Sequence, residues 1–326
     1  MSNPKNMIFA IVKDDLADIE TALSQSLNPY FELVSQVASH IMLSGGKRIR
    51  PLLFLLSTRI CGYKGNIAKK FSSIFEYLHT ASLLHDDIVD NAVLRRGQRV
   101  ANAIWGNSTA VLVGDFLLAR ASAIAVEAGS LEIIKVLSEI TEEMSQGEIH
   151  QLIKKGSLDI TETEYLEVIR RKTAVLFQGA CRIGALISNA SEEKKAALST
   201  CGFHLGIAFQ MVDDLIDYTS DTRTLGKEIG ADLKEGKLTL PVIHSLKTAE
   251  SNDRFLMEKI IKNKDFSTHE FETLVEMLKK YGGIAYTKKQ AAAHIEKAKQ
   301  ALAVFSPSES REVFLLIADY ILERNA

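Results

Sequence analysis

The sequence predicts an all-α fold: a large helical bundle formed by a single domain over residues 1–326. The chain contains only five prolines, and none lies between residues 52 and 240, so no helix breaker interrupts that stretch. Apolar residues recur at three- and four-residue spacing through most of the chain, which is typical of amphipathic helices. No run of alternating β-branched residues is long enough to predict a strand that matters for the fold.

Clusters of glycine, serine and asparagine divide this helical pattern into segments. They fall near residues 44–46, 62–66, 128–130, 156–159 and 189–191, where we expect turns between helices. No low-complexity linker separates the segments, so one continuous domain is the economical interpretation.

The segment after residue 160 has a clear helix start. Thr161 followed by Glu164 is the pattern of a capping box, and it predicts a helix that continues to Phe177. Residues 218–240 differ, because glycines alternate there with lysines before Pro241. We expect this segment to be a mobile, positively charged loop.

Bulk properties exclude several classes of protein. A hydrophobic content of 46% is ample for a sizeable core, and a net charge of -2 gives no electrostatic case for a nucleic-acid partner. Three scattered cysteines do not form a disulfide framework or a thiolate metal site, and they fit a reducing cytoplasm. The first ten residues do not form a secretory signal, and we expect no segment long enough to span a bilayer.

Two copies of one acidic motif, D-D-x-x-D, are the strongest functional signal. On a helix the first and last carboxylates of such a motif lie one above the other, with the middle one alongside. Mg²⁺ prefers oxygen ligands, relieves the repulsion between carboxylates and keeps positions open for substrate phosphates. Two facing clusters would therefore hold a diphosphate between metal ions. The carboxylates are Asp86, Asp87, Asp90, Asp213, Asp214 and Asp217.

The alternative is a pair of solvated acidic helix faces. Apolar neighbours such as Leu84, Ile88, Val212 and Leu215 argue against it, because they imply mostly buried helices that rarely carry unpaired carboxylates.

Basic residues gather at two places. Lys47 and Arg50 follow a pair of glycines, a geometry suited to a second phosphate group, although short basic clusters are often solvated surface. Arg95 and Arg96 follow the first acidic motif by five residues, and their planar guanidinium groups suit phosphate oxygens.

Four further polar residues gain weight from their positions. Gln210 lies three residues before the second acidic motif and shares its helical face, and His79 lies two turns before the first. Lys172 and Thr173 lie on the helix that begins after Thr161, where Lys172 would reach into a shared cavity. Taken singly, each could be a surface lysine, a satisfied core amide or a structural histidine.

Together these segments resemble the all-trans polyprenyl diphosphate synthases, the prenyl elongation enzymes, and in particular their long-chain, octaprenyl-type members. The resemblance covers essentially the full length. Its segments are residues 45–51, 79–97 (HTASLLHDDIVDNAVLRRG), 114–120 (GDFLLAR), 172–173, 206–217 (GIAFQMVDDLID) and 226–240 (GKEIGADLKEGKLTL). It implies the isoprenoid synthase type of helical bundle, with a central active-site cavity.

The resemblance also implies the site. Asp86 and Asp90 would bind Mg²⁺ on the allylic diphosphate, with Asp87 in support, and Asp213 together with Asp214 and Asp217 would complete a cluster of about three Mg²⁺ ions. The allylic diphosphate would contact Arg95, Lys172, Lys227 and Lys237. Isopentenyl diphosphate would contact Lys47, Arg50, His79 and Arg96. Thr173 and Gln210 would lie near the developing carbocation, so that Lys172, Thr173, Gln210 and Lys227 would be catalytic.

The implied reaction is condensation of isopentenyl diphosphate onto an allylic diphosphate, farnesyl or geranylgeranyl. Metal ions and cationic side chains would stabilise charge on the departing diphosphate. The isopentenyl double bond would then attack the allylic cation, and the released diphosphate is a plausible base for the lost proton. An apolar pocket would keep water from the cation.

Product length depends on the helix that carries the first motif. Ala81 and Ser82 lie about one turn before Asp86 and are too small to form a floor; each turn advances about 5.4 Å. A stop deeper in the pocket would come from Leu78 or Tyr77. We expect a long product of roughly seven to nine isoprene units (roughly C35–C45), octaprenyl first. A geranylgeranyl product is the alternative to a long product. Close packing of helices is the alternative reason for the small side chains of Ala81 and Ser82.

Two other classes are open. A class I terpene cyclase would carry a different second metal motif, and a catalytically silent regulatory subunit would be expected to have lost an aspartate motif. The resemblance further implies a homodimer, in which a long apolar product could require transient membrane contact for release.

Overall fold

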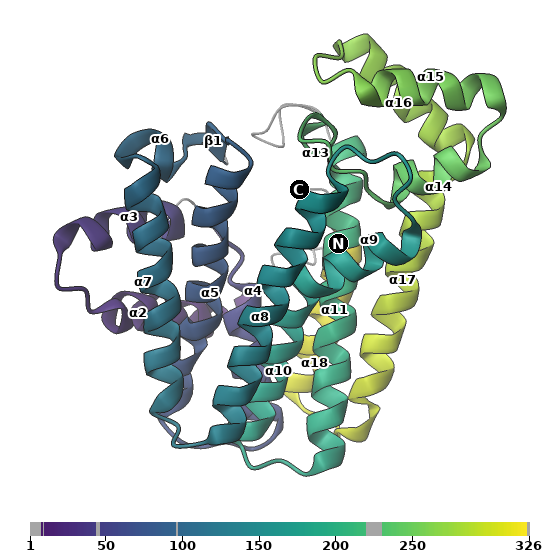
Figure 1. Ribbon diagram of the computed structural model, residues 1–326. Coiled ribbons are helices and arrows are strands. Elements are labelled where there is room, and N and C mark those ends of the chain that lie inside the picture. Colours follow the sequence, from purple (N-terminus) through teal and green to yellow (C-terminus); the bar gives the residue numbers. More distant parts are fainter. Residues whose placement is uncertain (1–7, 9, 44–45, 96, 220–229, 325–326) are drawn as a thin grey trace. The chain divides into compact units, whose positions relative to one another are not determined.

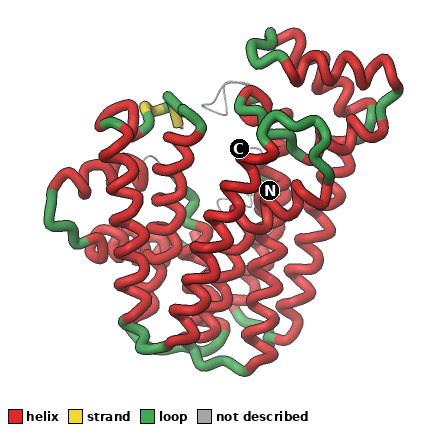
Figure 2. The backbone as a smooth tube through the Cα atoms, in the orientation of Figure 1, coloured by secondary structure: helices red, strands yellow, loops and turns green. Residues whose placement is uncertain are grey.

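The computed structural model is built almost entirely of helices (Figures 1 and 2). It describes residues 8, 10–43, 46–95, 97–219 and 230–324. The predicted all-α class is therefore confirmed. The described residues divide into two compact units. Unit 1 comprises residues up to Thr141 with Leu176–Gly202 and Lys299–Ile317, and unit 2 comprises Glu142–Val175, Phe203–Ala298 and the residues from Ala318. The single domain over residues 1–326 stays a prediction.

Unit 1 holds the N-terminal helices and a small hairpin. The helices are α2 (Lys13–Leu27), α3 (Glu32–Leu43), α4 (Ile49–Ile60), α5 (Ile67–Val89), α6 (Ala101–Trp105), α7 (Asn107–Val126) and the 3₁₀ turn η2 (Leu302–Val304). The antiparallel hairpin consists of β1 (Leu94–Arg95) and β2 (Gln98–Arg99), two residues each.

In its described residues, unit 2 contains five α-helices and a π-helical segment. They are α9 (Glu162–Ile169), the π segment η1 (Arg170–Ala174), α13 (Ala231–Lys234), α14 (Leu240–Thr248), α15 (Ser251–Lys262) and α16 (Thr268–Lys280). Among the described helices, five others contribute residues to both units: α8 (Leu131–Lys154), α10 (Val175–Ile187), α11 (Glu192–Thr219), α17 (Gly283–Ala301) and α18 (Glu309–Glu323).

Helix α5 organises the core of unit 1. Phe71, Ile74, Phe75 and Leu78 follow the i, i+3, i+4, i+7 spacing of one helical face and are buried. The helix packs against α2, α4 and α7, and the ring of Phe75 lies 5.2 Å from that of Phe54 on α4. This packing fixes the helix whose last turn carries the first acidic motif.

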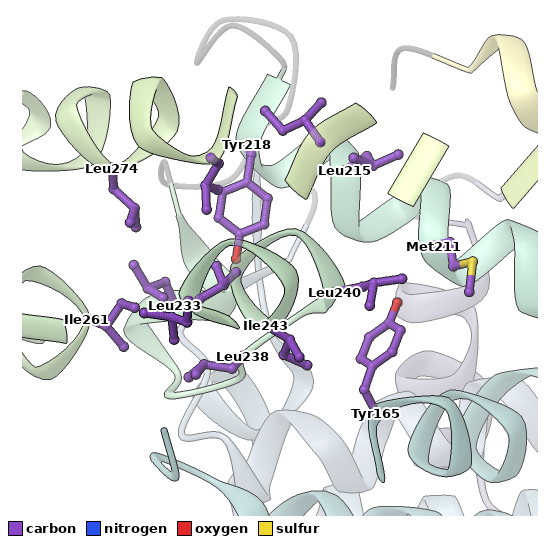
Figure 3. Close-up of a cluster of buried hydrophobic side chains, with 14 of the residues drawn as sticks. Tyr165, Met211, Leu215, Tyr218, Leu233, Leu238, Leu240, Ile243, Ile261 and Leu274 are labelled. Carbon is purple, nitrogen blue, oxygen red and sulfur yellow. The ribbon is translucent and has the colours of Figure 1, made fainter. Parts of the chain in front are cut away.

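A second buried cluster fills unit 2 (Figure 3). It brings apolar side chains of α11, such as Met211 and Leu215, together with residues from α14 to α16 and with Tyr165 of α9. The ring of Tyr218 stacks on Phe271 with centroids 6.0 Å apart. The apolar face of α11 is therefore buried in the core of unit 2, and the opposite face carries its solvent-accessible residues.

Four of the five predicted turns, at 62–66, 128–130, 156–159 and 189–191, are confirmed, since each falls between two helices. Residues 44 and 45 of the turn expected at 44–46 lie outside the described part of the chain. The capping box is confirmed as well. The Glu164 backbone N–H donates to Thr161 Oγ1 at 3.2 Å, and the Thr161 backbone N–H donates to Glu164 Oε2 at 2.8 Å.

Three details differ from the sequence predictions. The helix expected to run to Phe177 changes to π-helical hydrogen bonding over Arg170–Ala174. The segment expected to be a loop contains helix α13, and its residues 220–229 lie outside the described part of the chain. The β1–β2 hairpin was not anticipated, because two-residue strands leave no alternating pattern.

Helix α7 also contradicts the expectation that no segment reaches the length of a membrane span. By length and composition alone, its 20 residues are enough to cross a membrane. The core helix of a water-soluble protein passes the same test, and α7 carries Asp115 and Arg120. The helix is therefore weak support for a membrane-spanning segment.

Candidate active site

The first acidic motif ends helix α5. Asp86 and Asp87 lie in its last turn, and Asp90 is the C-cap residue, whose backbone N–H donates to the Asp86 carbonyl at 2.8 Å. Asp86 and Asp90 are partly exposed, whereas Asp87 is only 2% exposed. The motif thus presents its first and last carboxylates and turns the middle one inward.

Asp87 is paired with the hairpin. Nε and Nη2 of Arg95 lie 2.9 and 2.8 Å from Asp87 Oδ1. Burial raises the pKa of Asp87, and the hydrogen bond from Arg95 opposes that rise. Within the described residues Asp87 Oδ2 is buried without a hydrogen-bond partner. Asp87 therefore positions Arg95, which the sequence assigned to the allylic diphosphate.

The basic segment before α4 is organised by a residue that sequence reasoning did not select. Arg48 adopts a left-handed backbone conformation (φ 47°) and is buried. Its guanidinium donates to Glu20 at 2.6 Å, to Glu76 on α5 at 2.5 Å and to the Met42 carbonyl at 2.7 Å. The only available signal was its place between the two predicted phosphate-binding residues.

The predicted isopentenyl-binding residues that are described lie in unit 1. Lys47 and Arg50 flank the start of α4, and both are half-buried. The Arg50 guanidinium carbon lies 4.8 Å above the centre of the Phe177 ring. His79 is half-buried on α5. Arg96 lies outside the described residues.

The predicted chain-length residues differ in exposure. Tyr77, Leu78 and Ala81 are buried, and Ser82 is half-buried, with its hydroxyl donating to the His79 carbonyl at 2.8 Å. The Tyr77 hydroxyl donates to the Leu23 carbonyl of α2 at 2.6 Å. Tyr77 is thus fixed by a second helix.

In unit 2 the π segment carries Lys172 and Thr173. Such segments are frequent at functional sites, because they insert a residue and re-aim side chains. Helix α8 approaches this backbone closely: a Cβ at Gly147 would lie 2.8 Å from the Lys172 backbone nitrogen. Lys172 Nζ donates to Glu148 at 2.7 Å and to Gln151 at 3.0 Å, both on α8.

Four side chains of unit 2 form one hydrogen-bonded chain. The Thr173 hydroxyl donates to Gln210 Oε1 at 2.8 Å, and Gln210 Nε2 donates to Asp214 Oδ1 at 2.8 Å. The hydroxyl of Tyr165, whose ring is drawn in Figure 3, donates to Asp214 Oδ2 at 2.5 Å. Burial raises the pKa of Asp214, and the bonds from Tyr165 and Gln210 oppose that rise.

The other carboxylates of the second motif have different partners. Asp213 keeps 47% of its side chain exposed and pairs through Oδ1 with Nη2 of Arg324 at 2.6 Å. Arg324 lies above the Phe209 ring at 4.1 Å and was not foreseen, because its distance in sequence from Asp213 hides the contact. Asp217 is buried, and its Oδ2 accepts from the Asp232 backbone N–H at 3.3 Å.

Two predicted lysines complete unit 2. Lys237 Nζ pairs with Glu235 at 2.6 Å. Lys227, which the sequence assigned to the allylic diphosphate and to catalysis, lies outside the described residues.

The six motif carboxylates therefore fall into two classes. Asp86, Asp90 and Asp213 keep accessible surface, whereas Asp87, Asp214 and Asp217 are buried beside protein donors. Accessible carboxylate oxygens fit a hard divalent cation. Among the described residues no three His, Cys, Asp or Glu side chains gather closely enough to hold a metal ion by themselves. The metal ligands, and the facing of the two motifs, stay predictions.

Fold and site together define a helical enzyme with two aspartate-rich motifs and cationic side chains beside them. The sequence model of the polyprenyl synthetase family matches residues 31–278, and the chain belongs to this family. The resemblance found in the sequence is thereby confirmed, and membership supports a prenyltransferase.

Relatives include an octaprenyl diphosphate synthase and a geranylgeranyl pyrophosphate synthetase. The chain is 36% identical to octaprenyl diphosphate synthase of Escherichia coli (strain K12), over 98% of each chain. A crystal structure of polyprenyl synthase from Caulobacter crescentus CB15, complexed with calcium and isoprenyl diphosphate, has a TM-score of 0.92 at 34% identity, covering 98% of each chain. Geranylgeranyl pyrophosphate synthetase from Pyrococcus horikoshii Ot3 has a TM-score of 0.91 at 32% identity, covering 99% of this chain and 100% of its own.

Proposed function

We propose that this chain is an all-trans polyprenyl diphosphate synthase that adds isopentenyl diphosphate to farnesyl or geranylgeranyl diphosphate and makes a long-chain product. The observation that carries the proposal is the pair of D-D-x-x-D motifs, each with accessible carboxylates beside buried ones. Full-length similarity to an octaprenyl diphosphate synthase supports the long product.

Divalent cations, for which we propose Mg²⁺, would be held by Asp86, Asp90 and Asp213. Bound there, they would neutralise the negative charge of the allylic diphosphate. The three carboxylates have the oxygen donors and the exposure that this role requires.

Three cationic side chains would add to that charge stabilisation. Arg95, Lys172 and Lys237 are each paired with a carboxylate, which fixes their position before a ligand arrives. Charges that are already oriented cost little reorganisation when negative charge develops on a leaving diphosphate. Isopentenyl diphosphate would be held by Lys47, Arg50 and His79.

Product length would be set along helix α5. Because Ala81 and Ser82 are small, the first bulky side chains on this path are Leu78 and Tyr77, about a turn further from Asp86. Tyr77 is held in place by its hydrogen bond to the Leu23 carbonyl. This supports a long product, octaprenyl first. The alternative is a geranylgeranyl product, with Leu78 or Tyr77 as the floor. Similarity to the geranylgeranyl pyrophosphate synthetase of Pyrococcus horikoshii supports this alternative.

We also propose that the chain is a cytoplasmic homodimer. Helix α7 exposes large apolar side chains, with Val111, Leu112 and Val126 at 39%, 66% and 58%, a surface that a second copy could cover. The three cysteines are free thiols, consistent with a reducing compartment. Light scattering on the purified chain would give its oligomeric state, and a monomer would contradict the dimer.

The test of function is direct. The purified protein is incubated with Mg²⁺, farnesyl diphosphate and excess isopentenyl diphosphate, and the dephosphorylated products are resolved by length. A linear ladder ending near eight units supports the proposal, whereas a stop at four supports the geranylgeranyl alternative. Cyclised product would indicate a terpene cyclase, and no consumption a silent subunit.

Matched variants test the position of the floor. Ala81→Phe and Ser82→Phe should each shorten the product while the first condensations continue. Ala293→Phe, which makes the same change on an exposed face of α17, should leave the ladder unchanged. Unchanged length in both α5 variants would contradict the proposed path of the growing chain.

A further inference from the structure

The hydrogen-bonded chain of unit 2 contains two residues to which the proposed reaction gives no direct task. Asp214 and Tyr165 are each 4% exposed, so neither offers its polar atoms to solvent. Both Asp214 oxygens accept hydrogen bonds from protein side chains, at 2.5 and 2.8 Å. Asp213, the preceding residue, keeps 47% of its side chain exposed. Adjacent carboxylates of one motif thus have different surroundings.

The chain has a fixed direction. Asp214 Oδ1 accepts a hydrogen bond, which selects the amide orientation of Gln210 that places Nε2 toward the carboxyl group. The amide oxygen must then face Thr173, and it accepts the Thr173 hydroxyl proton. With that proton engaged, Thr173 Oγ1 offers only lone pairs to any further neighbour. Asp214 thereby determines, through Gln210, which end of the hydroxyl dipole is free.

Tyr165 fixes the other side of the carboxyl group. Its ring belongs to the buried cluster of Figure 3, and its helix begins at the capping box of Thr161. The hydroxyl occupies Asp214 Oδ2, so the carboxyl group cannot rotate without breaking a buried bond. Breaking such a bond is costly, because the orphaned groups cannot reach water.

We propose that Asp214 and Tyr165 are positioning residues, which hold Gln210 and Thr173 with oxygen lone pairs directed to the allylic cation of the prenyl transfer. The inference rests on the proposed function. Oriented dipoles stabilise developing charge because they need not reorganise during the reaction. A flipped Gln210 amide would instead donate to Thr173 and free its hydroxyl proton, which repels a cation.

The test compares isosteric variants in the condensation assay. Asp214→Asn keeps the shape but adds a donor, so it permits the flipped amide. We expect kcat to fall roughly tenfold to a hundredfold, less than or equal to the loss seen when one oriented donor is removed from an active site. KM for both diphosphates and the Mg²⁺ concentration for half-maximal rate should stay within about twofold of wild type. Tyr165→Phe should lower kcat in the same direction by a smaller factor.

Two controls separate positioning from stability and from metal binding. Tyr286→Phe removes another tyrosine-to-carboxylate bond of unit 2, from Tyr286 to Glu162 at 2.8 Å, and should leave kcat unchanged. Asp213→Asn should weaken Mn²⁺ binding, measured by electron paramagnetic resonance of the free ion. Asp214→Asn should not.

Each outcome decides. If Asp214→Asn weakens Mn²⁺ binding as much as Asp213→Asn does, Asp214 is a metal ligand and the inference is overturned. If Asp214→Asn does not fold, Tyr165→Phe decides, and an unchanged kcat in that variant overturns the inference. A wild-type chain that consumes no isopentenyl diphosphate overturns the proposed function as well, whereas an active wild type with unaffected variants overturns this inference alone.

Discussion

Replacing Arg48 with methionine should destabilise the protein strongly, and the structure gives the size of the effect. The Arg48 side chain is 5% exposed and its guanidinium joins two carboxylates of different burial: the Glu76 side chain is 9% exposed and the Glu20 side chain 46%. Without Arg48, the Glu76 charge would stay buried without compensation. Removing one partner of a buried pair costs about 3–5 kcal/mol.

That free energy can be expressed as a melting temperature. Unfolding entropy is about 2.1 cal/mol/K per residue, or about 0.7 kcal/mol/K for a chain of this length that unfolds in one transition. Arg48→Met should therefore lower Tm by about 4–7 °C, measured by circular dichroism at 222 nm near neutral pH.

Two further variants check the reasoning. Glu20→Gln removes the exposed partner of the same guanidinium and should cost less than about 1 kcal/mol, the usual value of a solvent-exposed pair. The double variant Arg48→Met/Glu76→Leu removes both buried charges and should recover most of the lost stability. If Arg48→Met melts within about 1 °C of wild type, or if the double variant is no more stable than the single, burial of Glu76 is not the cause.

Three other predictions concern unfolding in urea. Burial, with a smaller contribution from nearby His204, lowers the pKa of His294 to about 4. Between pH 6.5 and 4 the unfolded chain therefore binds more protons than the folded chain, and the free energy of unfolding should decrease as the pH is lowered through this window. His294→Gln should reduce this loss, and equal losses in both proteins would contradict the assignment. Gly283→Ala should cost about 1–3 kcal/mol, since its Cβ would meet the Pro241 carbonyl of α14; an unchanged urea midpoint would show that the helices can separate freely. Tyr77→Phe should cost about 1 kcal/mol through loss of one buried hydrogen bond, and an effect below about 0.3 kcal/mol would show that bond to be unimportant.

Local pattern was enough for most of the helices and for the family. The capping box at Thr161 depends on groups three residues apart, and the turns depend on short glycine, serine and asparagine clusters, so both can be read from neighbouring letters. The two D-D-x-x-D motifs are equally local. The π-helical hydrogen bonding over Arg170–Ala174 left no such signal, because an inserted residue changes the hydrogen-bonding pattern without changing the composition.

The sequence by itself determined that six aspartates in two motifs belong to one all-α prenyltransferase. Only the tertiary structure decided which of them are accessible. Asp87 accepts a hydrogen bond from Arg95 of the hairpin, and Asp214 accepts one from Tyr165 of another helix. Asp213 forms an ion pair with Arg324, 111 residues away in the sequence. The physical reason is that helical periodicity fixes the direction of a side chain along its own helix, whereas its burial and hydrogen-bond partners come from residues distant in sequence.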